Sequence, residues 1–247
     1  MTLKVPWLSK DIINQLATDL LLSYEDFTGK TLTPPIPVED IVERYLNLDL
    51  QYVDFYRKYG IENVFGALYV KSRTVAISDR LLQDKNEGRL IFTCAHEAGH
   101  WCLHRGYVEV AGRAAATEEG AVLCRTGESA KLPVEWQADY FAACLLMPEE
   151  MIRGAWSRAF SIEGTTMMIC NVKKTFRTLE LPDFRSFDTC IENWHLIADI
   201  VRTVGNFLNV SKQSMIIRLQ ELDLVRNLTS CSMDWSRLKQ QGSSAPK

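Results

Sequence analysis

The chain has 247 residues, of which 47% are hydrophobic, and its formal net charge at pH 7 is −3. This length and composition suffice for one well-packed core and a second, smaller one. The weak negative charge offers no general electrostatic attraction for nucleic acid. No apolar run approaches the roughly 18 residues of a membrane span, and the first residues do not read as a signal peptide, so we expect a cytoplasmic protein.

The first half of the chain predicts two helices, three strands and then a long helix. Apolar residues at helical spacing predict a helix over residues 9–24, capped by Ser9, and a second helix over residues 38–46. A change to strand-like patterning follows, with a tight turn before the last of the three strands, at residues 48–53, 65–70 and 74–78. The long helix is expected over about 86–105, with Gly106 as its stop signal.

The second half is expected to be mainly helical. Residues 107–132 are predicted to form a loop, whose residues 112–132 are polar with little periodicity; it is either a loop over or beside a cleft or a surface insertion without function. Pro133 and Pro148 bound a predicted helix of about four turns. Further helices are predicted over residues 149–160, 167–178, 191–207 and 212–222. We therefore expect two domains, a catalytic module over 1–148 and a helical accessory domain over 149–247 that ends in a helix-turn-helix-like pair and a flexible tail.

The most informative segment is His96-Glu97-Ala98-Gly99-His100, an H-E-x-x-H motif. Residues four apart share one face of a helix, so two imidazoles at this spacing can bind one zinc ion. Glu97 can then act as general base for the water that the metal activates. The alternative is a chance occurrence of the pattern, but the surrounding helical apolar spacing favours a metal site.

A catalytic zinc site also needs a third protein ligand. His104 lies about 12 Å along the helix axis from His96, so one metal ion cannot be bound by His96, His100 and His104 together. We interpret His104 as a residue near the end of the helix, favoured there by the helix dipole. Glu135 and Asp139 share a face of the next predicted helix and are better candidates. Glu135 suits a zinc ligand of the gluzincin type, and Asp139 suits an acceptor for the ring N–H of a ligand histidine. The alternative is that both are ordinary solvent-facing acids.

Cysteines do not suggest a disulfide framework or a cysteine metal site. Their number, seven, is odd, and no Cys-x-x-Cys occurs. Cys94 and Cys102 are rotated by about 200° on the helix from the two motif histidines, and Cys144 is similarly turned away from Glu135. We expect all three to be core residues.

Two segments together resemble the ImmA/IrrE family of zinc metallopeptidases. That family pairs an FTxAHExGHxxLH helix, here residues 92–104, with a later ExxA(N/D)xFAAxLLMP helix, here residues 135–148. Weaker similarity extends over about residues 10–225. The resemblance implies an α+β fold, in which a zincin-like module with a small twisted sheet and the H-E-x-x-H helix is followed by a mainly helical domain.

The resemblance also implies residue roles and a substrate. The zinc ligands would be His96, His100 and Glu135, with Glu97 as the base. The substrate would be a helix-turn-helix repressor or an antitoxin, cut once or a few times in the cytoplasm to derepress mobile-element or stress genes. An extended substrate could add to a free sheet edge at residues 65–70. Candidate donors to the oxyanion are Tyr107 and Tyr140, whereas His195 cannot be placed from sequence.

Two other function classes remain open. One is a DNA-binding regulator that acts through residues 210–224 and carries a structural metal, and the other is a protein that sequesters a repressor without cutting it. The predicted recognition helix offers one lysine and one arginine, Lys212 and Arg218, which favours an accessory role over DNA binding. A structural metal would not need Glu97. Two imidazoles and one carboxylate favour zinc over manganese.

Overall fold

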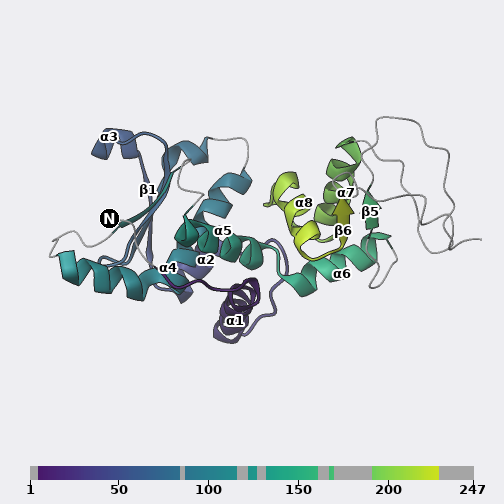
Figure 1. Cartoon of the computed structure of the whole chain (residues 1–247), viewed down its shortest axis with the longest axis horizontal. Helices are drawn as coiled ribbons and strands as arrows, with labels where there is room; N and C mark the ends of the chain where they lie inside the picture. The colour runs from purple at the N-terminus through teal and green to yellow at the C-terminus, as the bar shows by residue number, and fades with distance from the viewer. Residues whose placement is uncertain are drawn as a thin grey trace, which may run out of the picture.

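The computed structural model describes residues 5–83, 87–115, 122–126, 132–160, 167–169 and 191–227. The fold is α+β, as the sequence predicts: a four-stranded sheet packs on helices at one end, and a helical region continues the body at the other (Figure 1). Among the described residues, no helix combines the length and hydropathy needed to cross a membrane.

Helix α1 (Lys10–Thr28) opens the described fold and confirms the first predicted helix. Ser9 caps it by accepting a hydrogen bond from the backbone N–H of Ile12, and Gly29 ends it in the left-handed conformation (φ 65°) that glycine adopts without strain. The second predicted helix is one short α-helical turn, α2 (Val38–Asp40), continued by a π-helical turn, η1 (Ile41–Tyr45).

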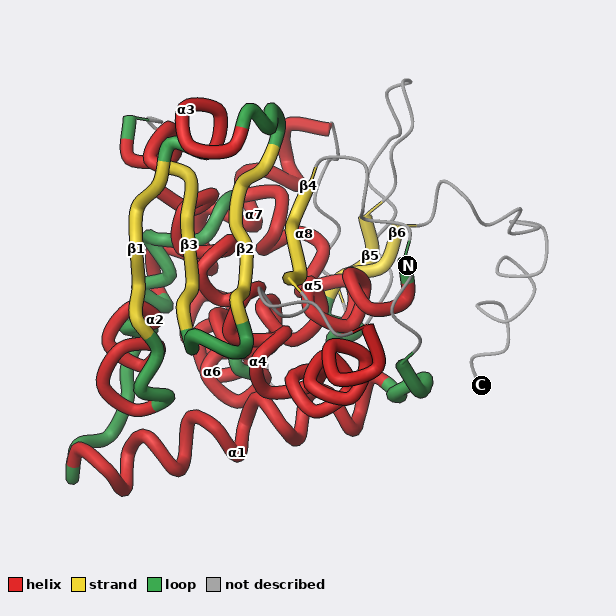
Figure 2. Tube along the Cα trace, turned by 90° about the vertical axis from the view of Figure 1, so that its left-hand side faces the viewer, coloured by secondary structure: helices red, strands yellow, loops and turns green. Residues whose placement is uncertain are grey.

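The sheet has the strand order β1-β3-β2-β4, seen face-on in Figure 2. The three predicted strands are confirmed, β1 pairs in parallel with β3, and β2 is antiparallel to both of its neighbours. Two short helical segments, α3 (Phe55–Tyr59) and η2 (Asp79–Leu82), follow β1 and β3. The strands are β1 (Asp49–Val53), β2 (Val64–Tyr69), β3 (Thr74–Ser78) and β4 (Val122–Thr126).

Strand β4 corrects two sequence predictions. It lies in the segment predicted as an aperiodic loop, and it covers the side of β2 that was predicted to be a free edge. A five-residue strand is too short for its periodicity to stand out between polar neighbours. In the described part of the sheet the edges are therefore β1 and β4, and residues 116–121 and 127–131 of the predicted loop lie outside the described residues.

Helix α4 (Glu87–Ala115) carries the H-E-x-x-H motif and is 29 residues long. The prediction that Gly106 ends it is wrong, because the helix continues for two more turns. A glycine inside a helix costs about 1 kcal/mol relative to alanine, and the residues on either side, Leu103 and Val108, are both buried against the core. Packing of these side chains outweighs the local preference to stop.

Helix α5 (Pro133–Leu146) confirms the next prediction, with Pro133 in its first turn and Pro148 just beyond its end. Helix α6 (Glu149–Phe160) is also as predicted. The helix predicted over 167–178 is wrong where it is described, because Met167–Ile169 forms strand β5, parallel to β6 (Val225–Asn227). A Met-Met-Ile run has no period that distinguishes a strand from a helix.

Helices α7 (Ile191–Val204) and α8 (Lys212–Glu221) follow, and Ser211 caps α8 as predicted. They share one continuous apolar core with the helices before Pro148. Arg218 of α8 is buried and donates to the carbonyl oxygen of Met147 (3.1 Å) and to Asn14 Oδ1 (3.0 Å). The division into domains at residue 148 stays a prediction, and the tail from residue 230 lies outside the described residues.

Candidate metal centre

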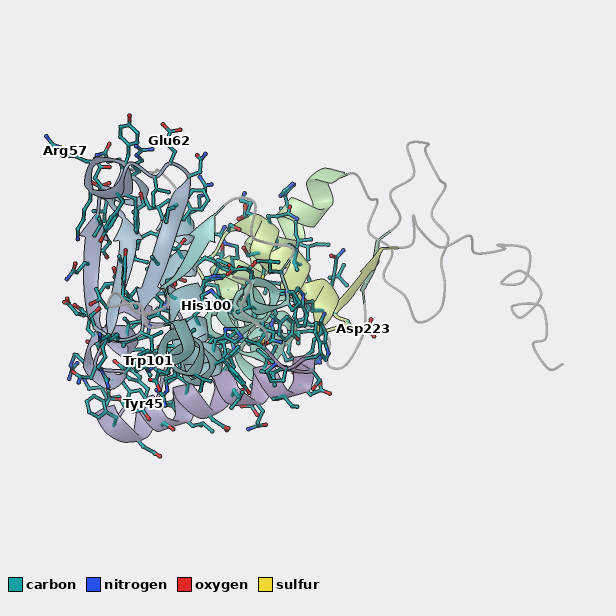
Figure 3. The ribbon with its side chains drawn as sticks, turned by 60° about the vertical axis from the view of Figure 1, so that its left-hand side comes forward. Tyr45, Arg57, Glu62, His100, Trp101 and Asp223 are labelled. Carbon is teal, nitrogen blue, oxygen red and sulfur yellow. The ribbon has the colours of Figure 1, made fainter. Side chains whose placement is uncertain are left out.

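Helices α4 and α5 bring two histidines and one glutamate together in the interior. His96 Nε2 lies 3.3 Å from Glu135 Oε2, and His100 Nε2 lies 3.5 Å from Glu135 Oε1. The two imidazole rings are nearly perpendicular, with centroids 4.5 Å apart. Figure 3 places His100 among the helices in the interior of the body rather than at its surface.

These distances fit a zinc ion. Bonds of about 2.0–2.2 Å in a tetrahedral arrangement put neighbouring donors about 3.3–3.6 Å apart, which matches the two measured separations. The three ligand atoms all lie within 4.8 Å of one another, and all three residues are buried. The residues that the sequence predicts as ligands are thus brought together in a geometry that can hold a metal.

Gly99, the second variable position of the motif, allows the two helices to approach closely. A Cβ atom at Gly99 would lie 3.2 Å from both the carbonyl oxygen of Ala138 and Cδ1 of Phe141. Such contacts are tighter than most real Cβ contacts, so any side chain here would push α5 away. A small residue on each helix, Gly99 on α4 and Ala138 on α5, therefore brings Glu135 within reach of the histidines.

Burial keeps His100 in its neutral form. It lowers the pKa of His100 to about 4, so the imidazole is neutral at pH 7 and keeps a lone pair. The neutral imidazole of His100 and the buried carboxylate of Glu135 are donors whose negative charge a divalent cation would balance.

Asp139 contacts His96 from the side opposite Glu135. The His96 Nδ1 atom lies 2.8 Å from Asp139 Oδ1. Because an ionised carboxylate only accepts hydrogen bonds, His96 donates through Nδ1–H, and its Nε2 lone pair faces Glu135. This is the contact that the sequence predicts for Asp139.

Glu97 is fully buried on α4 and its side chain lies against β2. A Cβ atom at Gly66 would stand 2.6 Å from Glu97 Oε1 and 2.7 Å from Thr93 Cγ2. Gly66 lies next to an irregularity in the pairing of β2 with β4. Sequence reasoning missed Gly66, although a glycine inside a strand often marks the close approach of another group.

The prediction for His104 is wrong. It does not lie at a helix end but is buried in the middle of α4, with Nδ1 3.0 Å from His100 Nδ1 and Nε2 3.0 Å from Gln137 Oε1. The error follows from the expected stop at Gly106. The available signal was the spacing of four between His100 and His104, which places both side chains on one face of the helix.

The remaining predicted residues take less central positions. Cys94 and Cys144 are buried and Cys102 packs against the core, as predicted for all three. Tyr107 is partly exposed, and Tyr140 stacks on Trp136; an oxyanion role for either stays a prediction. His195 is exposed on α7.

Comparison with known families agrees with this site. A peptidase family model described as the IrrE N-terminal-like domain matches residues 55–180, half of the chain, and this range includes both motif helices. The chain belongs to this family. As an IrrE-like protein it is a peptidase of the metallopeptidase type, and a protein substrate follows from that. No curated protein matches the chain.

Proposed function

We propose that this IrrE-like protein is a zinc-dependent endopeptidase that performs limited proteolysis of a regulatory protein. The observation that carries the proposal is the buried group of His96, His100 and Glu135, with Glu97 one residue from the first histidine on the same helix. The regulatory protein would be a helix-turn-helix repressor or an antitoxin, and cleavage would derepress mobile-element or stress genes in the cytoplasm.

The residues present would hold zinc through the Nε2 atoms of His96 and His100 and the carboxylate of Glu135. A metal bound there would supply Lewis acidity, which polarises a peptide carbonyl and lowers the pKa of water. Two nitrogen donors and one carboxylate favour zinc over the harder ions magnesium and manganese.

The protein's own groups do the rest of the chemistry. Glu97 accepts the proton of the attacking water and returns it to the leaving amine. Its position is constrained by contact with β2 at Gly66. Asp139 keeps His96 in the tautomer that presents Nε2 to the metal.

The sheet offers a docking edge for an extended substrate, though not the one the sequence predicts. Strand β4 lies at the edge of the described sheet and neighbours β2, whose Gly66 lies against Glu97. A substrate strand paired with β4 would thus lie nearer to Glu97 than one paired with the opposite edge, β1. Backbone pairing of this kind provides affinity without demanding a particular sequence.

The basic residues of α8 support this proposal over a DNA-binding regulator. Lys212 forms an ion pair with Asp199 of α7, and Arg218 is buried with its guanidinium bonded to Met147 and Asn14. Both positive charges of the predicted recognition helix are therefore engaged within the protein. Strong binding to phosphates requires several accessible lysines or arginines.

Co-expression with a candidate helix-turn-helix repressor tests the proposal. Wild-type protein should cut the repressor, and Glu97→Gln should not, because the amide keeps the shape of the side chain but cannot accept a proton. Glu109→Gln is a matched control, since Glu109 is exposed on the same helix. Cleavage by Glu97→Gln would exclude Glu97 as the base. Derepression by Glu97→Gln without cleavage would instead support the sequestering alternative.

A further inference from the structure

A chain of hydrogen bonds leads from His100 to the segment ahead of α1. His100 Nδ1 contacts His104 Nδ1 (3.0 Å), His104 Nε2 contacts Gln137 Oε1 (3.0 Å), and Gln137 Nε2 donates to the carbonyl oxygen of Pro6 (2.9 Å). His100, His104 and Gln137 are each no more than 1% exposed. These hydrogen bonds connect α4, α5 and the N-terminal segment on the side of His100 remote from Glu135.

The Pro6 carbonyl determines which group donates and which accepts in each of these hydrogen bonds. A backbone carbonyl can only accept, so the NH₂ group of Gln137 must face Pro6, and its Oε1 must face His104. Oε1 can only accept, so His104 donates to it through Nε2–H. A neutral His104 then has a lone pair on Nδ1, and His100 must donate to it through its own Nδ1–H. The lone pair of His100 is left on Nε2, the atom that faces Glu135.

We propose that His104 and Gln137 are positioning residues for the metal site. They hold His100 in the tautomer and orientation that present Nε2 to the metal, and the Pro6 carbonyl sets the direction of the whole chain. The inference rests on the metal site of the proposed function and extends it. Neither residue touches the metal or the substrate.

The two ligand histidines are thus oriented by different means. His96 is held by Asp139, whose side chain is 34% exposed, so that this carboxylate keeps part of its hydration. His100 is fully buried and faces the buried carboxylate of Glu135. A further carboxylate there would add an expensive buried negative charge. A neutral imidazole and a neutral amide orient His100 without adding one.

The N-terminal segment is tied to α5 at a second point. Trp7 stacks on Trp136 with ring centroids 4.8 Å apart and an interplanar angle of 11°. Trp136 is adjacent to the ligand Glu135, and Gln137 follows it. The stacking holds the Pro6 carbonyl in place over α5. The series of hydrogen bonds from Pro6 through Gln137 and His104 to His100, here called the relay, therefore depends on contacts that the polypeptide makes before α1 begins.

Ring-nitrogen NMR of the metal-free protein labelled with ¹⁵N-histidine tests the relay directly, because the chain has only four histidines to assign. His104 should be the Nε2–H tautomer and His100 the Nδ1–H tautomer. The opposite tautomers, or an imidazolium at His104 at neutral pH, would overturn the inference. This measurement needs neither metal nor substrate.

Zinc affinity, measured by competition with a chelator, provides the second readout. Gln137→Met and His104→Phe each put an apolar side chain of similar size in place of the polar one and so remove the hydrogen bonds, and each should weaken zinc binding about 10–100-fold. His104→Gln, which retains one acceptor and one donor, should restore part of the affinity. His195→Gln is the control, because His195 is exposed on α7 and should leave affinity unchanged.

The outcomes separate the relay from the site itself. Wild-type affinity in a folded Gln137→Met or His104→Phe protein would refute the relay alone. A wild-type protein that binds no zinc would refute the metal site and with it the proposed function. If His104→Phe does not fold, the tautomers of the unsubstituted protein and the affinity of Gln137→Met still decide.

Discussion

Replacing Gly66 with alanine should inactivate the protein without removing its metal. The added Cβ would stand 2.6 Å from Glu97 Oε1, whereas ordinary contacts begin at 3.4 Å, so the carboxylate must move by about 0.8 Å. The strand is restrained on both sides, because Gly66 is paired with Ile77 of β3 and Arg125 of β4. Thr93, 2.7 Å from the same Cβ, is held by its hydrogen bond to the carbonyl of Arg89.

The size of the effect follows from this displacement. A misplacement of about 1 Å in a reacting group can cost about 100-fold in rate, and overpacking of a rigid core costs about 1–3 kcal/mol in stability. We therefore expect cleavage of the substrate to fall about 100-fold. Zinc content should stay near one per chain, because the ligands lie on α4 and α5 and not on β2.

The assay is cleavage rate, zinc content and urea unfolding, measured together for Gly66→Ala and for Gly106→Ala. Gly106 is the control, since a Cβ there meets no atom within 4 Å outside the helix's own backbone. Gly106→Ala should keep full activity and gain about 0.5–1 kcal/mol, the helix preference of alanine over glycine. Wild-type cleavage by a stable Gly66→Ala protein would refute the claim that this contact positions Glu97.

Three further predictions concern the metal ligands and their surroundings. His96→Ala, His100→Ala and Glu135→Ala should each lose zinc by elemental analysis, and retention of full metal by any one of them would remove it from the ligand set. Asp139→Ala should be milder, with zinc affinity or activity lower by about 10–100-fold; a variant indistinguishable from wild type would show that His96 does not need this partner. The metal-free protein should lose stability in acid. The pKa of His100 is about 4 in the folded protein and 6.5 ordinarily, so between these values the unfolded state binds the proton and the folded state does not. The free energy of unfolding is therefore highest above pH 6.5 and falls as the pH is lowered towards 4. Urea unfolding at pH 7 and pH 4.5 checks this, and His100→Ala should flatten the dependence.

Helical spacing alone indicates which of the site residues share a face. The spacing of four between His96 and His100, and between Glu135 and Asp139, depends only on the geometry of a helix, which local apolar periodicity and the flanking prolines already indicate. Three strands and the cap at Ser211 are likewise local features, and they are confirmed. The resemblance of the two helical motifs to one family could be stated from sequence because both motifs are contiguous.

The partners that lie across from these faces come from contacts between distant segments. The contact of Gly66 with Glu97, the burial of His104 against Gln137, and the pairing of β4 with β2 each join segments distant in sequence. Helix α4 continues past Gly106 for the same reason, because the core that covers Leu103 and Val108 outweighs the cost of a glycine. Periodicity shows which side chains face the interior, whereas the partner that each one meets depends on the packing of whole elements, which no local pattern records.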